Sequence, residues 1–558
     1  MHSRPRNLIV VVLVIALLSA CNKSIPDHAR YIPKDAVAVA GINLKALGKK
    51  IAWNVITGSK LFKEMQDRIA EKNSKEAVNG IDKAGIDFVN TIYVYVKTDN
   101  RYKGGNRVTG LVPLSDAGQW EAYVKQAFPQ VEIKQNGDHK EASLGRDMYV
   151  GWNKQLMIVI NVMPNTPDYA EMAMGKNDGN AGQKSSLDMS TISAEMANAF
   201  NVPGENSIMG NKHFTNLEME GHDMTFMLNY EQLMTQVSGD MAEKIGMSLS
   251  SSLWKDAAFT CGFDFVKGKI TVDMRYYLSP EMNDVGTELG ATNVDKEMLD
   301  KLPNQNMDML LALHLSPKGI RALMEKMNLY GLANAGLSTQ NLNVDTVLGA
   351  FTGDMAIVMN DFSLHTENVT DNFMGQKVVH QNQKPSVNLT YVIKLNKKEN
   401  FQKLVDLAKN NGLPPMGNGF VIPIDEKDSV YIMMNGQYAV ASNNFADASG
   451  FLKGDMNTQK IPDAVSSQVY GHPAAFYLDI QQLFKNIDPG ISNSAHDSAM
   501  IVESKKLLNN IYFTGGAFKN NAFEYHLDIN FMNTEENSII DLMDYGMKMS
   551  DADKIQGK

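Results

Sequence analysis

The sequence has only two cysteines, Cys21 and Cys261. A small disulfide-stapled fold is therefore excluded, and the protein must depend on a hydrophobic core for its stability. Cys261 lies in a strand-like apolar run, residues 257–262, and no general base can be assigned to it. We therefore expect a buried, unreactive thiol at this position and not a catalytic cysteine.

The sequence also lacks an apolar run long enough to cross a bilayer as a helix. The run at residues 8–18 has eleven residues, whereas a spanning helix needs roughly 20. Two arginines precede it and small residues follow it, which is the anatomy of a secretory signal peptide. Leu18, Ser19, Ala20 and Cys21 form a sequence similar to the lipobox recognised by lipoprotein signal peptidase. We expect residues 1–20 to be removed and Cys21 to carry fatty acyl chains such as palmitate. An ordinary signal peptide with a chance cysteine is the alternative.

The residues after Cys21 indicate where the anchored protein resides. Asn22 replaces the aspartate that retains many Gram-negative lipoproteins in the inner membrane, which favours the outer membrane. Residues 23–26 lack the acidic cluster associated with surface display, so we expect a periplasm-facing protein, with the cell surface as the alternative. Several acyl chains anchor stably, since each buried CH₂ contributes roughly 0.8 kcal/mol. Residues 21–30 are then a short lipidated tether.

Runs of basic residues are absent as well. The net charge of −10 becomes −12 when residues 1–20, with two arginines and no acids, are removed (−10 − 2 = −12). Nucleic-acid binders use clustered positive charge, so nucleic acid is excluded as a partner. The net negative charge also argues against broad attraction to anionic lipid headgroups, which leaves the acyl chains as the membrane contact.

No catalytic, cofactor or metal motif is complete. Residues 179–185 contain Gly-Gln-Lys-Ser but lack the spacing of a phosphate-binding loop. Ser252 and Lys255 fit Ser-x-x-Lys, yet the companion motifs of penicillin-recognising enzymes are missing. The 11 histidines include no His-Glu-x-x-His, so no zinc site is predicted. We therefore assign no catalytic, cofactor-binding or metal-binding residue.

Methionine is abundant, with 35 Met against 22 Phe. Three pairs have the spacing of copper-binding methionines, namely Met172 and Met174, Met224 and Met227, and Met547 and Met549. These pairs are scattered, and flexible methionine commonly fills gaps in a core, so we expect core filler.

Six segments recur in the same order in the two halves of the chain, which predicts a duplication. The matched segments are 38–44 with 309–315, 92–96 with 355–359, 110–127 with 391–408, 148–155 with 430–437, 221–222 with 471–472, and 259–262 with 513–516. His222 and His472 occupy matching positions after glycine. They could be a symmetric pair of ligand-binding or pH-sensing groups, or simply polar residues at the start of a strand. Asn396 with Glu399 reads as a capping box, and Asn435 with Gly436 as a two-residue hairpin turn.

The predicted fold class is α+β, with two tandem diverged repeats. The element order in each half resembles a ferredoxin-like arrangement, with a mainly antiparallel sheet and helices on one face. The expected segments are 31–297 for the first repeat, 298–550 for the second and 551–558 for a C-terminal tail. Extra residues around 162–221 in the first repeat and 363–386 in the second predict exposed loops, the usual place of recognition.

The entry into the first repeat, residues 31–36 followed by 42–50, resembles that of a Bacteroidetes lipoprotein family of unknown function. Members carry a lipobox and then a proline, an acidic residue, an alanine and an apolar strand. The resemblance covers nearly the whole mature chain. It implies an envelope lipoprotein and supplies no activity or site residues.

Two functions remain after this reading. The first is a membrane-anchored envelope lipoprotein without enzymatic activity, which binds or scaffolds a protein or glycan partner through the inserted loops. The alternative is a periplasmic or surface hydrolase directed at glycans, whose carboxylates converge from distant segments. A deep pocket with two facing carboxylates would favour the hydrolase.

Overall fold

The computed structural model describes residues 24–51, 83–97, 107–144, 148–162, 189–202, 204–235, 250–373, 376–424, 428–454, 461–487 and 495–556. These residues form two compact units. The described residues up to 235, together with 260–262, belong to the first unit, and the others belong to the second.

The first unit is built on an antiparallel sheet. Its elements in chain order are η1 (Asp27–Tyr31), β1 (Ala38–Asn43), α2 (Leu44–Lys50), β2 (Thr91–Lys97), β3 (Arg107–Pro113), α5 (Ala117–Ala127), β4 (Lys134–Asn136), β5 (His139–Ser143), β6 (Met148–Trp152), β7 (Leu156–Val162), α7 (Met189–Phe200), η4 (Gly204–Asn206), η5 (Ile208–Gly210), α8 (Lys212–Glu220) and β8 (Met224–Asn229). The strand order is β8-β1-β2-β3-β7-β6-β5-β4, and every neighbouring pair is antiparallel.

Local sequence explains why α5 begins and ends where it does. The Asp116 carboxylate accepts the backbone N–H groups of Gly118 and Gln119, which caps the first turn. Trp120, Val124 and Ala127 recur at spacings of three and four and are all buried, so one face of the helix enters the core. The helix stops before Pro129, because the residue before a proline avoids helical backbone angles.

Helices of the first unit cover both faces of its sheet. Trp120 on α5 packs edge-on against Trp152 of β6, at 6.4 Å between ring centroids. On the other face a Cβ added to Gly151 would meet Met196 and Phe200 of α7. Residues 151 and 152 point to opposite faces because side chains alternate along a strand. The expectation that helices lie on one face is therefore wrong for this unit.

The pairing of β1 also differs from a ferredoxin-like sheet. In that arrangement the strands on either side of a helix run parallel, with another strand between them. Here β1 and β2, on either side of α2, are direct antiparallel neighbours, with Ala40 opposite Val94.

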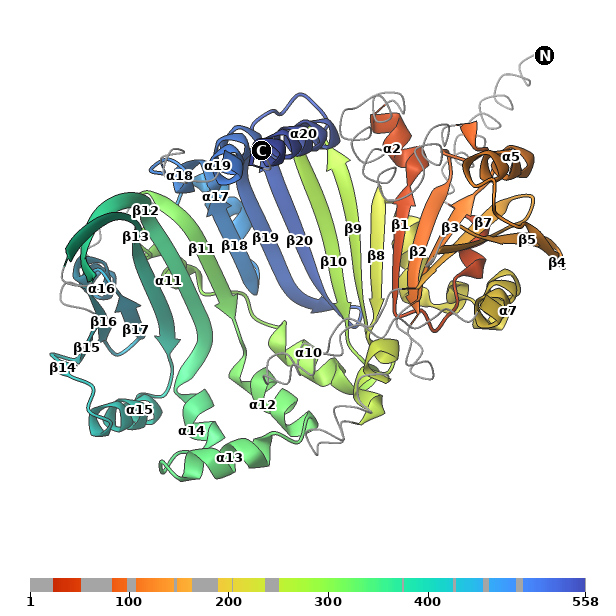
Figure 1. Cartoon of the computed structure of the whole chain (residues 1–558). Coiled ribbons are helices and arrows are strands. Elements are labelled where there is room, and N and C mark those ends of the chain that lie inside the picture. Colours follow the sequence, from red (N-terminus) through yellow and green to blue (C-terminus); the bar gives the residue numbers. More distant parts are fainter. Residues whose placement is uncertain are drawn as a thin grey trace, which may run out of the picture. The chain divides into compact units, whose positions relative to one another are not determined.

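The second unit has a longer antiparallel sheet. Its elements are η6 (Ser251–Trp254), β9 (Ala258–Val266, of which 260–262 belong to the first unit), β10 (Lys269–Tyr277), η7 (Pro280–Met282), α10 (Asn283–Leu289), α11 (Lys296–Asp300), β11 (Met307–His314), α12 (Pro317–Lys326), α13 (Tyr330–Ser338), α14 (Val344–Gly349), β12 (Phe351–Phe373), β13 (Gln376–Leu395), α15 (Lys398–Asn410), β14 (Pro415–Met416), β15 (Gly419–Pro423), β16 (Ser429–Met434), β17 (Tyr438–Ser442), α16 (Phe445–Lys453), α17 (Asp463–Val469), β18 (Ala474–Asp479), α18 (Ile480–Leu483), α19 (Ala495–Leu507), β19 (Leu508–Lys519), β20 (Ala522–Phe531) and α20 (Ser538–Gln556). The strand order from β10 is β10-β20-β19-β18-β11-β12-β13-β17-β16-β15-β14. Figure 1 shows the strands from β13 to β10 side by side.

The core of the second unit lies between its sheet and the helices α11, α16 and α17. Met298 of α11, Phe451 of α16 and Val469 of α17 are buried against Leu310 and Val392 of the sheet. On the paired strands β10 and β20, the charged His526 of β20 lies opposite Asp273 of β10. Hydrogen bonds with Asp273 and then Asp528 raise the pKa of His526 to about 9.

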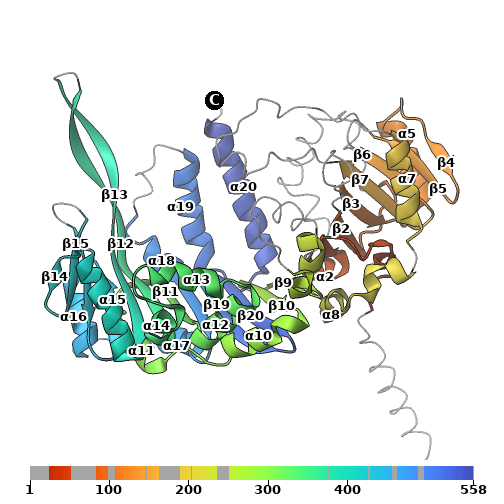
Figure 2. The same cartoon turned by 90° about the horizontal axis from the view of Figure 1, so that it is seen from below.

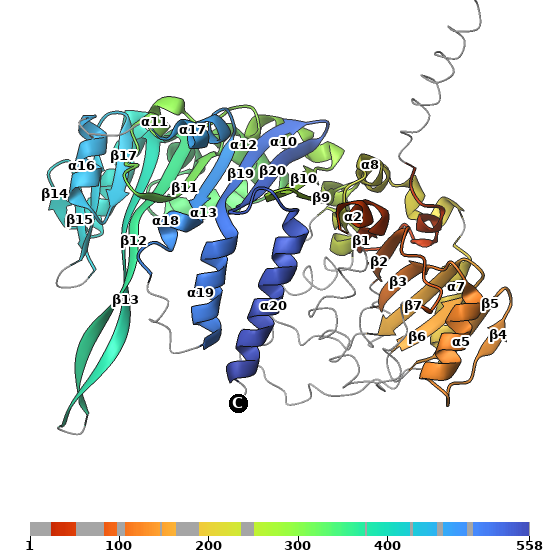
Figure 3. The same cartoon turned by 90° about the horizontal axis from the view of Figure 1, so that it is seen from above.

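Residues 363–386 form a two-stranded arm and not a loop. Pairing of β12 with β13 continues from Ser363 opposite Ser386 to Phe373 opposite Gln376. The arm, α19 and α20 project on the same side of the second unit (Figures 2 and 3). The two strands leave the sheet together because they keep the hydrogen bonds between them. The predicted loop is therefore wrong here.

The predicted loop at 162–221 contains α7, η4, η5 and α8 in its described part.

Irregular pairing marks the base of the arm. The register of β12 shifts between Asn360 and Ser363. The buried Asp308 carboxylate accepts the N–H of Phe362, at 2.8 Å, within this irregularity. Burial raises the pKa of Asp308, and the charges of Asp361 and Asp479 add to the rise.

Two local predictions fail in the second unit. Asn396 does not cap α15, which begins after Lys397 without a side-chain cap, and the Asn396 N–H donates to Ala350 O. The hairpin between β16 and β17 has a longer turn than Asn-Gly alone, since Met434 pairs with Ala439.

Candidate binding pocket

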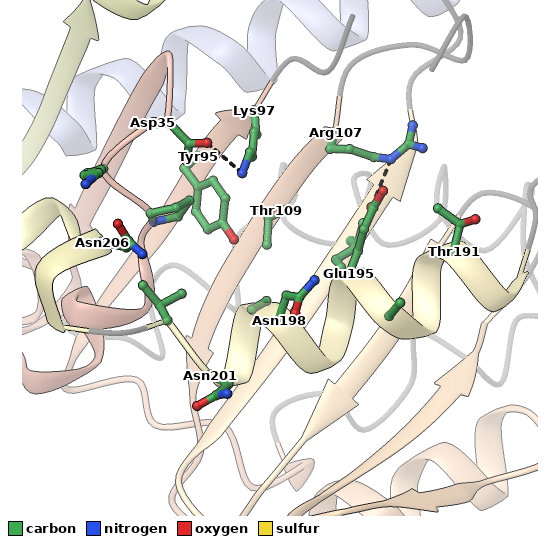
Figure 4. Close-up of a pocket in the computed structure, with 16 residues that line it drawn as sticks. Asp35, Tyr95, Lys97, Arg107, Thr109, Thr191, Glu195, Asn198, Asn201 and Asn206 are labelled. Carbon is green, nitrogen blue, oxygen red and sulfur yellow. Dashed lines mark hydrogen bonds and ion pairs between the residues drawn. The ribbon is translucent and has the colours of Figure 1, made fainter. Parts of the chain in front are cut away.

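A pocket of about 970 Å³ lies on the face of the first unit that α7 covers (Figure 4). This volume is within the roughly 300–1,000 Å³ of small-molecule sites. Its lining comes from β2, β3, β7, α7 and the segments around 33–35 and 201–206. The polar and charged lining residues are Lys34, Asp35, Tyr95, Lys97, Arg107, Thr109, Thr191, Glu195, Asn198, Asn201 and Asn206.

The register of β2 and β3 places two cations side by side in this pocket. Tyr95 lies opposite Thr109, and Lys97 lies opposite Arg107. Residues directly opposite on antiparallel strands share a face, so all four side chains are on the pocket side. Two like charges in this position destabilise a strand pair unless they are neutralised.

Each cation is neutralised by an acid from a different element. Lys97 Nζ lies 2.8 Å from Asp35 Oδ2, and both side chains are about half exposed. Arg107 Nε lies 3.1 Å from Glu195 Oε2 of α7. The Arg107 side chain is 12% exposed, so the guanidinium is held more firmly than the ammonium of Lys97, whose side chain is 41% exposed. The two carboxylates of the pocket are therefore engaged with cations and do not act on each other.

Tyr95 forms part of the pocket floor. It is 4% exposed, and burial, partly offset by a hydrogen bond with Thr109, raises the pKa of its phenol to about 12. Tyr95 is therefore neutral at physiological pH. With Thr109 and the asparagines, it gives the pocket uncharged groups that can both donate and accept hydrogen bonds.

A buried polar network anchors α7 over the pocket. The Ser193 hydroxyl of α7 donates to Glu141 Oε1 of β5 at 2.7 Å. The ring of His139 on β5 stacks on Phe200 at the end of α7, with 4.5 Å between centroids. His139 Nε2 also lies 3.6 Å from Glu141 Oε2. These contacts fix the helix that carries Glu195.

The residues predicted for lipid attachment and cleavage, Cys21 with Leu18, Ser19 and Ala20, lie outside the described residues. So do residues 179–185 and the pair Met172 and Met174. In the part of the chain that the structure describes, no helix has the length and apolar character needed to span a membrane.

Cys261 on β9 is buried, as expected. Its neighbour Gly262 makes room for His222, because an added Cβ would lie 2.2 Å from the ring. His222 Nε2 is 3.0 Å from Glu220 Oε2. Burial alone lowers the pKa of His472, so the two matched histidines have different surroundings.

The described residues hold no group of three or more His, Cys, Asp or Glu side chains able to bind a metal ion. Met224 and Met227, three apart on β8, point to opposite faces, and Met547 and Met549, two apart on α20, do not face each other. Ser252 lies on η6, where its hydroxyl is 2.6 Å from that of Ser250.

Sequence reasoning missed the pocket. The available signal was the alternation of Tyr93, Tyr95 and Lys97, which places the lysine on the face of two buried tyrosines. The acids that complete the pocket, Asp35 and Glu195, come from segments far from Lys97 and Arg107 in the chain, and no local pattern connects them.

No protein-family model matches the chain, and comparison with characterised proteins finds no relative. Among solved structures, crystal forms of a protein called TP0453 are similar to part of it. Crystal form III has 9% identity and a TM-score of 0.24 and covers 46% of this chain and 81% of its own. Crystal form IV has 9% identity and a TM-score of 0.25, and the match covers 50% of this chain and 91% of its own. A likeness of this size carries no conclusion about fold or function.

Proposed function

We propose that the protein is an envelope lipoprotein that binds a polar ligand in the pocket of its first unit, without enzymatic activity. Acyl chains on Cys21 would hold it to the outer membrane, facing the periplasm. The pocket then replaces the inserted loops as the primary binding site. The partner remains an envelope glycan or protein segment.

The observation that carries the binding proposal is the way the acids of the pocket are used. A carboxylate pair that hydrolyses glycosidic bonds needs one acid and one base or nucleophile facing the scissile bond. Asp35 and Glu195 are instead each paired with a cation, at 2.8 and 3.1 Å. Paired charges, amides and hydroxyls suit recognition of a polar molecule. We therefore prefer a binding module to the glycan-directed hydrolase.

We also propose that residues 31–297 and 298–550 are diverged copies of one unit. In each copy the strands and helices follow one another along the chain in a ferredoxin-like order, but the strands do not pair as they do in a ferredoxin-like sheet. The pairings support this. The order β8-β1-β2-β3-β7-β6-β5-β4 corresponds one for one to β18-β11-β12-β13-β17-β16-β15-β14.

A shared turn supports the same proposal. Asn153 Oδ1 accepts the N–H groups of Gln155 and Leu156 in the hairpin of β6 and β7. Asn435 Oδ1 accepts those of Gln437 and Tyr438 in the hairpin of β16 and β17. The same residue type performs the same function at matching places.

Binding can be tested by blocking the pocket. Asn198→Trp would place a large ring at the mouth, and Asn411→Trp, on an exposed position at the end of α15, is a matched control. The immobilised mature proteins would be incubated with soluble saccharide and peptide fragments of the envelope, and the retained molecules identified by mass spectrometry. We expect wild type and control to retain molecules that Asn198→Trp loses. Identical profiles for all three proteins would overturn the proposal.

The anchor needs its own test. Cys21→Ser should abolish incorporation of labelled palmitate and move the protein out of the outer-membrane fraction. Persistent labelling, or unchanged fractionation, would overturn the lipid attachment.

A further inference from the structure

We infer that the pocket of the first unit selects ligands that carry a carboxylate, and that Lys97 and Arg107 are the residues that determine this specificity. The inference rests on the proposed binding function and adds the chemical class of the ligand. It starts from an arrangement that the fold does not require, two cations directly opposite each other on β2 and β3.

The second unit indicates that this strand pair forms without the cations. There Val358 lies opposite Thr390, as Tyr95 lies opposite Thr109 in the first unit. Two residues further along, Asn360 and Asn388 are opposite each other, where the first unit has Lys97 and Arg107. Two neutral amides serve the pairing in the second unit. The two cations, which need Asp35 and Glu195 to neutralise them in the first unit, are therefore explained better by a ligand than by folding.

The charge of the pocket favours an anion. Its lining has the three cations Lys34, Lys97 and Arg107 and the two acids Asp35 and Glu195, a balance of +1 (3 − 2 = 1). The whole chain has a net charge of −10. The pocket thus has the opposite sign to the protein that holds it, and such a local field raises the concentration of small anions at the site.

The two ion pairs differ in how readily a ligand could enter. The pair of Lys97 with Asp35 is half exposed, and exposed pairs contribute little stability, so a ligand carboxylate can take the place of Asp35 at small cost. The pair of Arg107 with Glu195 is more buried and keeps the guanidinium oriented. A planar guanidinium matches the two oxygens of a carboxylate. In this arrangement Arg107 would orient the carboxylate and Lys97 would move to meet it.

The remaining lining describes the rest of the ligand. Asn198, Asn201 and Asn206 offer amides, and the hydroxyls of Tyr95 and Thr109 lie more deeply at the floor, bonded to each other. The apolar part of the lining comes from Pro33, Ile160, Val202 and two alanines, so the ligand can also carry a small apolar portion. The ligand therefore has a hydrogen-bonding body with one acidic group, as in an acidic saccharide or the free C-terminus of a short peptide. These two sources share the carboxylate.

Matched probes separate the carboxylate from the body that carries it. Glucuronic acid would be compared with glucose, and triglycine with triglycinamide, by isothermal titration of the mature protein at low salt. We expect at least one acidic probe to bind at least tenfold more tightly than its neutral partner, with the preference falling as salt screens the charges. The acidic probe that binds identifies the source.

Variants assign the preference to the two cations. Lys97→Gln and Arg107→Gln should each reduce affinity for the acidic probe at least tenfold and leave the neutral probe unchanged. Arg107→Lys, which keeps the charge but loses the planar fork, should lose part of the affinity. Lys384→Gln is the control, because Lys384 is a partly exposed lysine of the second unit, 3.9 Å from Asp428. Unchanged thermal midpoints would show that the variants fold.

Three results would overturn the inference. These are equal affinity for acidic and neutral probes, unchanged affinity in both glutamine variants, and no binding of any of the four probes. If Asn198→Trp removes envelope molecules that Lys97→Gln and Arg107→Gln still retain, the binding function stands and only the carboxylate specificity fails.

Discussion

Replacing Tyr93 by phenylalanine tests a buried tyrosine–carboxylate hydrogen bond of the first unit. Tyr93 is fully buried on β2, and its hydroxyl donates to Glu218 Oε2 at 2.5 Å. The Thr225 hydroxyl donates to the other oxygen, Glu218 Oε1, at 2.6 Å. Gly41 leaves room for this arrangement, since an added Cβ would lie 2.5 Å from Thr225 Oγ1. The substitution therefore removes one of two donors from a carboxylate in the interior.

The size and the pH dependence of the effect follow from this geometry. A hydrogen bond to a charged group contributes about 1.5–3 kcal/mol, so Tyr93→Phe should lower the free energy of unfolding of the first unit by about 2 kcal/mol at pH 8. Burial raises the pKa of Glu218, and the hydrogen bonds from Thr225 and Tyr93 oppose that rise. Without the tyrosine hydroxyl the pKa rises further. A carboxyl with a raised folded-state pKa loses stability as the pH rises from its unfolded pKa through its folded pKa. The cost should therefore be smaller at pH 5 than at pH 8.

Tryptophan fluorescence can follow the first unit during denaturation by guanidinium chloride. Trp120 and Trp152 are buried in the first unit, and Trp254 belongs to the second unit. A Trp254→Phe background therefore removes the fluorescence of the second unit's tryptophan. Tyr477→Phe is the control, because it removes a tyrosine–carboxylate bond of 3.0 Å from the second unit and should leave this transition in place. A cost for Tyr93→Phe below about 0.5 kcal/mol, or an equal cost at both pH values, would refute the reasoning.

Substitutions at Gly262, Asp308 and His526, with a rescue at His222, test other parts of the structure. Gly262→Ala should destabilise the first unit by about 1–3 kcal/mol because the added methyl group would overlap the ring of His222; His222→Ala should restore part of the loss, and the fluorescence transition measures both. Asp308→Asn should stabilise the second unit more at pH 8 than at pH 4, because burial and two nearby aspartates raise the pKa of that carboxyl; thermal melts with equal shifts at both pH values would contradict this. The proton on His526, held by two aspartates, should stabilise the second unit in full below pH 6.5, and this stability should be lost as the pH rises through about 9. His526→Asn should remove this pH dependence, and an NMR titration giving His526 a pKa near 6.5 would count against the prediction.

Local patterns in the sequence were sufficient for many elements. The apolar run before Leu44 predicts a strand that leads into a helix, and the structure has β1 followed by α2. The apolar spacing around Trp120 and Val124 predicts the buried face of α5. These features depend on periodicity within one segment, which the sequence contains in full.

Features that depend on competition between segments could not be predicted in this way. Asn396 has the side chain of a helix cap, but its backbone is used in pairing with Ala350, and the helix starts later. The arm at residues 363–386 exists because two neighbouring strands extend together, which a reading of either strand alone cannot detect. The pocket has the same origin, since Glu195 reaches Arg107 only after α7 packs on the sheet.

The chemical reactivity of Lys97 in the mature protein shows directly whether the pocket binds a carboxylate. Its lysines would be acetylated briefly with and without a saturating amount of the acidic probe that binds, and the labelled fraction at each lysine measured by mass spectrometry. If the pocket of the first unit holds the carboxylate, labelling of Lys97 should fall severalfold while that of Lys384 stays constant. Unchanged labelling of Lys97 at saturation would contradict the account.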